Sequence, residues 1–445
     1  MTTDVETQIS EWRQYVQAHP AIVEADVDEM EEHLREQIAD LTETGLGEDE
    51  AFLIAVKRMG NLDAISHEFA REHSERLWKQ LVLLPDESTT GGGRRTELWV
   101  ALGLGVGAAI SARLGIALLD EERAAANAGL LVLPFLAAFF VWKRQVPARV
   151  AGGIALGLAV LAVVVNVFPF DEGGSTQVLT VIHAPIVAWF LVGVAYVGGD
   201  WTSHRRRMDF VRFTGEWFVY YVLLALGGGV LVGLTVGAFS TLGHDPETVI
   251  GEWVIPFGAA GAVLVAAWLV EAKQAVVENI APVLTRIFTP LSVLMLLAVL
   301  GAFVSDGSVL HVDRDLLILM ALILVLVLGL LLYAISARDP RSPVDAFDWL
   351  QLALVVSAIL VDAVVLVAML SRIAEFGASA NKVAALGLNL LLLGNLLRAT
   401  VLGFGFTGGR EPFGAVERWQ TTYLPLYAAW AAAVVVVLPP AFGWE

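Results

Sequence analysis

From residue 98 to the end of the chain, long apolar stretches alternate with short polar connections. Each stretch has close to the roughly 20 residues that an α-helix needs to cross the hydrocarbon core of a bilayer. Eleven such spans are predicted, at approximately 98–119, 124–142, 149–168, 178–198, 217–242, 253–272, 287–305, 315–335, 349–370, 382–402 and 421–441. The pattern therefore predicts an all-α fold: a polytopic membrane helix bundle that occupies residues 98–445.

The first 84 residues follow a different pattern, in which apolar residues recur at helical intervals between charged ones. Four short amphipathic helices are predicted, at 4–17, 26–43, 48–59 and 62–80. The second has one apolar stripe with spacings of four and three residues, formed by Met30, Leu34, Ile38 and Leu41. In the third, Ala51, Phe52 and Ala55 are expected to face a small core. Residues 1–84 are thus predicted to form a small soluble helical domain, joined to the membrane region by a flexible, Gly-rich linker at 85–97.

The composition agrees with a membrane protein that carries an acidic soluble domain. Hydrophobic residues make up 57% of the 445 residues, and the mean hydropathy is +0.68, which is far above that of ordinary soluble proteins. Residues 1–95 hold 21 Asp and Glu against 9 Lys and Arg. An acidic domain repels phosphate backbones, so nucleic-acid binding is not expected. The absence of cysteine excludes disulfides, thiolate metal sites and a cysteine nucleophile.

The distribution of basic residues predicts the orientation of the spans. When the N-terminus is placed in the cytoplasm, fifteen Lys and Arg of the linker, connections and span ends lie inside. The four that fall outside are Arg123, Arg314, Arg372 and Lys382. The bias persists along the whole chain, which a wrong span count would disturb. We therefore expect a multi-pass protein of the inner (plasma) membrane with its N-terminus inside and its C-terminus outside. Because the N-terminus is polar and acidic, the first span is expected to act as the insertion signal.

The N-terminal region resembles the HAAS and permease prefix domains, which are small helical modules at the N-termini of bacterial membrane proteins. The residues that carry the resemblance are Met30-Glu31-Glu32-His33-Leu34-Arg35-Glu36, Leu41, Gly45, Glu50-Ala51-Phe52, Ala55, Arg58-Met59-Gly60 and Glu68-Phe69. They cover about 70 residues. The resemblance implies a cytoplasmic regulatory or interaction module without catalytic activity.

Regularly spaced glycines in several spans predict places where helices approach closely. Gly229, Gly233 and Gly237 repeat every four residues in the fifth span. Two further pairs with the same spacing are Gly103 with Gly107 in the first span and Gly153 with Gly157 in the third. Tight helix–helix contact is the favoured interpretation, and a hinge or a pore lining is the alternative.

Five polar residues within the predicted spans are candidates for a functional site: Asp362, Asn389, Asn395, Arg113 and Arg398. Ionisable groups in hydrocarbon cost free energy and tend to face a bundle interior or a cavity. Asp362 and Asn389 are predicted at similar depth and form a candidate proton or cation site, with a helix–helix hydrogen bond as the alternative. Arg113 is the candidate counter-charge for an ionised Asp362, unless it extends to the outer interface. Arg398 is expected to extend to the inner interface.

The ninth and tenth spans are predicted to be joined by a polar hairpin at 371–382. It places two basic residues on a face whose other loops are acidic or neutral, which indicates either a salt bridge between loops or an anion contact. Its motif residues are Arg372, Glu375, Gly377, Asn381 and Lys382. The run Arg372-Ile373-Ala374-Glu375-Phe376-Gly377, with Asn381-Lys382-Val383, is similar to a signature of an uncharacterised polytopic family, domain of unknown function 4153, with Phe for Tyr and Lys for Arg at two positions. The resemblance implies no activity.

No pattern typical of catalysis accompanies these features. The chain has neither a phosphate-binding Gly-x-x-x-x-Gly-Lys-Ser/Thr loop nor a Gly-x-Ser-x-Gly elbow, and its eight histidines show no metal-ligand spacing. We expect no enzymatic activity, no cofactor and no metal.

The favoured function is a sensory or regulatory membrane component whose residues 1–84 bind a cytoplasmic protein. The alternative is a transporter or permease that moves an ion or small solute near Asp362, Asn389 and Asn395. A membrane-embedded lipid-modifying enzyme ranks last.

Overall fold

The fold is known from a computed structural model, which describes residues 5–6, 9–10, 12–13, 24–43, 47, 51–52, 55, 91–241, 246–272, 280–306 and 314–445. Every regular element in these residues is a helix, and none of them lies in a strand. The chain divides into two compact units, Met1–Gly91 and Gly92–Glu445. This division lies within the stretch 85–97 that the sequence predicts as a linker.

The N-terminal unit is built around α2 (Glu24–Glu43) and has a small hydrophobic core. Leu34, Ile38 and Leu41 of the predicted apolar stripe are buried, as are Ala51 and Ala55. These positions confirm the helical periodicity that the sequence shows. The side chain of Met30 and the predicted helix at 62–80 lie outside the described residues.

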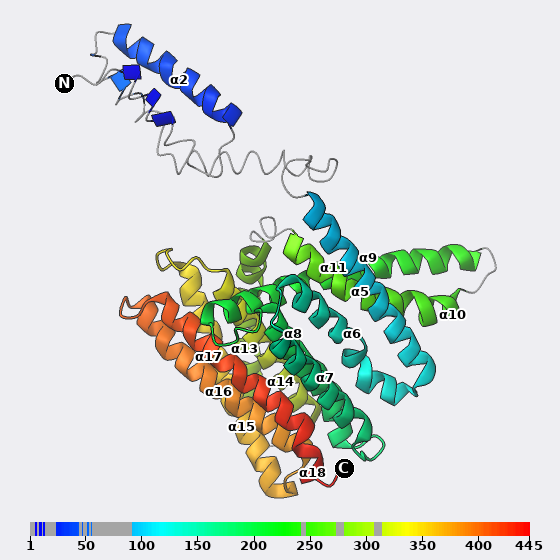
Figure 1. Cartoon of the computed structure of the whole chain (residues 1–445). Helices are drawn as coiled ribbons and strands as arrows, with labels where there is room; N and C mark the ends of the chain where they lie inside the picture. The colour runs from blue at the N-terminus through cyan, green and yellow to red at the C-terminus, as the bar shows by residue number, and fades with distance from the viewer. Residues whose placement is uncertain are drawn as a thin grey trace. The chain divides into compact units, whose positions relative to one another are not determined.

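The second unit consists of long helices with short connections (Figure 1). Their bounds are α5 Gly91–Leu118, α6 Glu121–Lys143, α7 Ala148–Val167, α8 Ser175–Tyr196, α9 His204–Thr241, α10 Glu247–Val249, η1 Ile250–Val254, α11 Ile255–Ala272, α13 Ile280–Asp306, α14 Arg314–Ala337, α15 Ala346–Phe376, α16 Ala380–Thr407, α17 Phe413–Val436 and α18 Leu438–Ala441. The element η1 is a short π-helix that leads into α11.

Ten helices of the described residues are long and apolar enough to cross a membrane. They are α5, α6, α7, α8, α9, α11 together with η1, α13, α14, α15 and α16. The predicted eleventh span, 421–441, corresponds to α17 with α18. The first half of α17 carries Glu417, Arg418 and Gln420, and this helix is not among the ten. The total of eleven and the orientation of the spans therefore stay predictions.

The helices of the second unit form two groups, each with its own hydrophobic core. One core combines residues of α5, α6, α7, α8, α11 and the first part of α9. The other combines residues of α13, α14, α15, α16 and α17. The groups meet where α8 packs against α17 and α9 packs against α14. Within the second group, α15, α16 and α17 lie side by side (Figure 1).

Two predicted boundaries differ from those of the structure, and the second affects the site. Helix α5 begins at Gly91, so the end of the predicted linker is helical. Helix α15 continues to Phe376, six residues past the predicted end of the ninth span, and α16 begins at Ala380. The polar hairpin is therefore a tight turn of three residues, since polar side chains continue a helix where it leaves the apolar region. Gly377 has a φ of +74° and ends α15.

Only two of the regularly spaced glycines, Gly107 and Gly157, have the close helix contact predicted for them. A Cβ atom added at Gly229, Gly233 or Gly237 would have no atom of the described residues within 4 Å, so the stripe on α9 is open rather than packed. Gly103 and Gly153 are equally open, whereas Gly107 and Gly157 face Phe135 and Leu191. The tightest approach lies elsewhere, on α16, where a Cβ at Gly387 would lie 2.0 Å from the Trp430 ring of α17.

Candidate functional site

Asp362 lies in the middle of α15 and is completely buried. The helix forms because its residues are almost all apolar and because Asp345 and Asp348 cap its first turn in a reciprocal pair of hydrogen bonds. Val361 and Val365, on either side of Asp362, are part of the core of this group of helices. Neither carboxyl oxygen of Asp362 has a hydrogen-bond partner among the described residues. An ionisable side chain is therefore held in apolar surroundings without a counter-charge.

The register of α15 and α16 decides which residues of α16 lie at the level of Asp362. Asp362 is 14 residues before Phe376 and Asn395 is 15 residues after Ala380, which places both about 21–22 Å from the turn at 1.5 Å per residue. Asn389 is only about 14 Å from the turn by the same rise. Its amide nitrogen lies 3.9 Å from the sulfur of Met369. The predicted pairing of Asp362 with Asn389 is therefore wrong in register, because α15 is longer than predicted.

Helix α17 supplies two further members of the site. The side-chain amide of Asn395 donates to Gln420 Oε1 and to the hydroxyl oxygen of Tyr427, at 2.9 Å each. The indole N–H of Trp419 donates to the backbone oxygen of Asn395 at 3.1 Å. By the register of α15 and α16, Asp362 lies at the level of Asn395. We call Asp362, Asn395, Gln420 and Tyr427 the buried polar cluster.

The buried polar cluster contains more polar atoms than hydrogen bonds to satisfy them. Besides the two oxygens of Asp362, Asn395 Oδ1 and Gln420 Nε2 have no partner among the described residues, and the same holds for the nearby Asn389 Oδ1. Each buried polar atom left unpaired costs about 1–3 kcal/mol, and an ionised carboxylate costs considerably more. The arrangement therefore suits a neutral acid that exchanges a proton, or oxygen atoms that contact a small cation.

The centre of the buried polar cluster, formed by Asp362 and Asn395, is closed to solvent in this structure. Asp362, Asn389 and Asn395 are each 0% exposed. None of these three residues lines any of four cavities found within the described residues. Hydrogen bonding between α16 and α17 and a proton site are both consistent with this geometry.

Arg113 is not the counter-charge of Asp362. It lies on α5 in the other group of helices, where its guanidinium group is 3.0 Å from Glu252 Oε2 and 4.7 Å from the centre of the Trp253 ring. Both partners belong to η1, the π-helix that precedes α11. The sequence did not reveal this pair because the predicted sixth span begins after Glu252.

Arg398 and the hairpin residues are also separate from the buried polar cluster. Arg398 is exposed on α16, nine residues before its end at Thr407. In the turn, the ammonium group of Lys382 donates to the carbonyl oxygen of Gly377 at 2.7 Å. Lys382 and Arg372 both lie over the Phe376 ring, at 5.6 and 5.8 Å from its centre. Glu375 is exposed and Asn381 is half-buried.

These contacts explain most of the hairpin motif as a stable turn. Gly377 permits the positive φ, and Lys382 caps the end of α15 through a backbone oxygen. Arg372 and Lys382 lie over the same aromatic ring, and a Phe ring provides this contact as well as a Tyr ring does. The motif thus has a structural role that requires no ligand.

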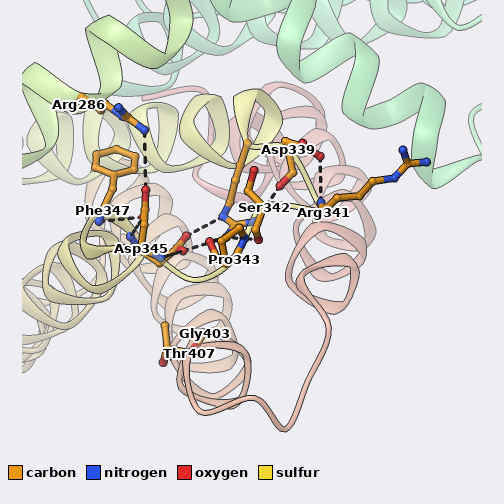
Figure 2. A network of polar contacts seen from close by, with 11 residues as sticks. Arg286, Asp339, Arg341, Ser342, Pro343, Asp345, Phe347, Gly403 and Thr407 are labelled. Atoms are coloured by element: carbon orange, nitrogen blue, oxygen red, sulfur yellow. Dashed lines mark hydrogen bonds and ion pairs between the residues drawn. The ribbon is translucent and has the colours of Figure 1, made fainter. Parts of the chain in front are cut away.

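Sequence reasoning missed the polar network at the other end of α15 (Figure 2). The guanidinium group of Arg338 binds both carboxyl oxygens of Asp348, at 2.7 and 2.9 Å. It also donates to the backbone oxygens of three residues in the following loop, Asp339, Ser342 and Pro343.

Aromatic rings complete this network. The Arg338 guanidinium lies over the adjacent rings of Phe406 and Phe413, 4.7 Å from each centre. Arg286 lies 3.8 Å from Asp345, the capping residue of α15 (Figure 2). The network joins the loop before α15 to α16 and α17. Its only signal in the sequence was the spacing of Asp345 and Asp348, which is typical of a helix cap.

The fold and the buried polar cluster define an all-helical, multi-pass membrane protein with a polar centre in its second group of helices. No protein-family model, no curated protein and no solved structure matches the chain.

Proposed function

We propose that the chain is a membrane protein of sensory or regulatory type, whose N-terminal module, residues 1–84, binds a cytoplasmic protein partner. The observation that carries this proposal is that Met1–Gly91 form a compact unit with a hydrophobic core of their own. A unit that buries its apolar side chains internally keeps its charged side chains for contacts with another molecule. The resemblance to regulatory prefix modules supports the same function.

In this proposal the partner contacts the exposed face of α2. Leu34 and Ile38 point into the core, whereas Glu32 and Arg35 are exposed. Arg35 is held by Glu6 at 2.6 Å, and its guanidinium group keeps the pKa of that carboxyl below its usual range. Glu32 has no ion pair among the described residues, so its charge is available to a basic surface on a partner.

The state of the buried polar cluster also favours a regulatory function over transport. A transport route requires a hydrated path to the binding residues, and Asp362 is sealed on all sides in this structure. A closed polar centre is compatible with a helix bundle that changes its packing when a signal arrives.

The proposal is tested by co-purification of the full chain from membranes after chemical cross-linking. Deleting residues 1–90 is expected to abolish capture of the partner, and Glu32→Arg is expected to weaken capture. The control is Glu121→Arg, which reverses the charge of an exposed Glu on the second unit, at the start of α6. Retention of every partner by the deletion variant would disprove the proposal.

Transport of a proton or small cation is the second candidate function, and the unpaired carboxyl group of Asp362 is the observation in its favour. Proteins tolerate the free energy cost of burying an unpaired carboxyl group mainly where that residue has a function. The candidate requires a second conformation in which water reaches Asp362. It predicts that purified protein in vesicles dissipates an imposed pH or sodium gradient and that Asp362→Asn stops this flux.

The control for the transport assay is Asp171→Asn, which removes an exposed carboxylate from a loop of the same unit. Vesicles in which the unaltered protein gives no flux above empty vesicles would eliminate the second candidate and leave the first intact. Flux that is equal in both variants would show that the route avoids Asp362.

A further inference from the structure

Arg207 lies in the first turn of α9 and is only 7% exposed, yet it has no carboxylate partner among the described residues. Its Nη2 atom donates to the carbonyl oxygen of Thr202 at 3.3 Å. Its Nε atom is buried without a hydrogen-bond partner, and Nη1 makes no hydrogen bond to a described residue. Arg338, by contrast, binds both carboxyl oxygens of Asp348. Because a buried cation without an anion is costly, the unpaired guanidinium group indicates that an anion from outside the chain completes the site.

The Arg207 guanidinium group is directed at the N-terminus of α9. Thr202, to which it donates, lies two residues before the helix begins. The first N–H groups of a helix have no partner within the helix, and those of His204 and Arg205 have no other partner among the described residues. Free N–H groups and the positive end of the helix dipole attract an anion to the same place as the guanidinium group.

Helix α17 supplies a second guanidinium group. The Nδ1 atom of His204 lies 2.8 Å from the hydroxyl oxygen of Thr421, which is completely buried, so the start of α9 is joined to α17. Arg418 precedes Thr421 by three residues and therefore lies on the same side of α17. Arg418 is exposed and forms no ion pair with a described residue. Unpaired arginines of two helices thus lie near the N-terminus of α9.

The carboxylates of this region do not neutralise these two arginines. Asp200 lies 3.7 Å from Arg206, on the other side of the chain's entry into α9. Glu417 is next to Arg418 along α17, but it forms no ion pair with a described residue, so its oxygens lie more than 4 Å from both guanidinium groups. Positive charge is therefore in excess where the two helices meet.

We propose that the N-terminus of α9, with Arg207 and Arg418, is a binding site for a phosphate group. A phosphate has enough oxygens to accept from two guanidinium groups and from the free N–H groups of the helix together. Planar guanidinium groups also match its geometry through two parallel hydrogen bonds. This inference is independent of the N-terminal module and goes beyond the proposed function.

The phosphate can belong to an anionic phospholipid or to a soluble phosphate ester. Three consecutive arginines at 205–207 place the first turn of α9 at a membrane surface, where both are present. Basic pockets between membrane helices are a recurring site for lipid head groups. The two sources share the phosphate chemistry, and the experiment distinguishes them.

The experiment uses the purified full chain in a phosphate-free detergent and measures the rise in unfolding temperature that a bound ligand causes. Inorganic phosphate and phosphatidylglycerol are titrated separately. Their blanks are chloride at the same ionic strength and diacylglycerol, which is a lipid without a phosphate. A rise with inorganic phosphate assigns the site to a soluble phosphate ester, and a rise with phosphatidylglycerol alone assigns it to a lipid head group. No rise with either probe beyond its blank would overturn the proposal.

Two variants locate the binding at the proposed residues. Arg207→Gln and Arg418→Gln are each expected to weaken binding of the effective probe about tenfold, the factor that one charge-assisted hydrogen bond provides. The control is Arg149→Gln, which removes an exposed arginine at the start of α7 and is expected to leave binding unchanged. Arg418→Gln changes an exposed side chain and serves if Arg207→Gln does not fold. Equal binding by the Arg418→Gln and Arg149→Gln variants would overturn the proposal.

Discussion

Replacing Gly387 by alanine tests the packing of α16 against α17, which positions the buried polar cluster. The added methyl group would lie 2.0 Å from Cζ2 and 2.1 Å from Cη2 of Trp430. Carbon atoms of this kind separate to about 3.5 Å or more, so the ring or the helix must move by over 1 Å. The Trp430 ring is rigid and packs among buried residues at the end of α17, so it has little room to turn.

We expect this substitution to destabilise the protein by about 2 kcal/mol, within the range of overpacked cores and after the small gain in helix propensity of alanine. The assay is equilibrium unfolding in mixed micelles with an increasing fraction of dodecyl sulfate, followed by far-ultraviolet circular dichroism. Adding Trp430→Phe to Gly387→Ala removes the clashing atoms and is expected to restore at least about 1 kcal/mol, which a double-mutant cycle measures.

The matched control is Gly233→Ala on α9, where an added Cβ would meet nothing within 4 Å in the described residues. We expect it to leave stability unchanged or to raise it by up to about 1 kcal/mol, since alanine favours the helix. The reasoning would be refuted if both glycine substitutions had the same effect, or if Trp430→Phe gave no relief.

Three further predictions concern ion pairs. Arg338→Lys keeps the charge but loses the two-point contact with Asp348, so we expect faster hydrogen exchange at the start of α15 and no change at its end. Glu271→Gln removes the shared carboxylate partner of Lys143 and Arg144, a side chain that is 2% exposed. It is expected to lower the unfolding free energy by about 3 kcal/mol in the same micelle assay. Because Arg35 lowers the pKa of Glu6, this pair stabilises the N-terminal unit above the ordinary pKa of Glu and is lost as pH falls through the lowered value. Arg35→Gln is therefore expected to reduce the acid sensitivity of hydrogen exchange in α2, and equal pH profiles would contradict this.

The sequence located the residues of the site but not their partners. Asp362 and Asn395 were recognisable because a polar residue within an apolar stretch is visible along the chain alone. Gln420 and Tyr427 were not recognised, since both lie on a helix that has other polar residues and their significance depends on facing Asn395. The predicted counter-charge Arg113 has a partner in Glu252, which no pattern along the chain relates to it.

The glycines also show which features the sequence could predict and which it could not. Their spacing on α9 predicted close packing, whereas close contacts occur at other glycines, among them Gly387 and Gly394 on α16, which face Trp430 and Tyr423. Each pair is seven residues apart on its helix, a repeat that brings the same faces together in antiparallel helices. Regular glycine spacing shows only that one face of a helix carries small residues. Whether another helix packs on that face depends on the arrangement of the whole bundle.

The sequence by itself determined the class of protein, the positions of most spans and the apolar stripe of α2. These follow from hydrophobic burial and helical periodicity, which act on each segment independently of the others. Only the tertiary structure decided the register of α15 and α16, the rotation of each helix about its axis and hence the membership of the buried polar cluster. Depth changes by about 1.5 Å for each residue added to a helix, so six extra residues in α15 were enough to exchange Asn389 for Asn395 at the level of Asp362.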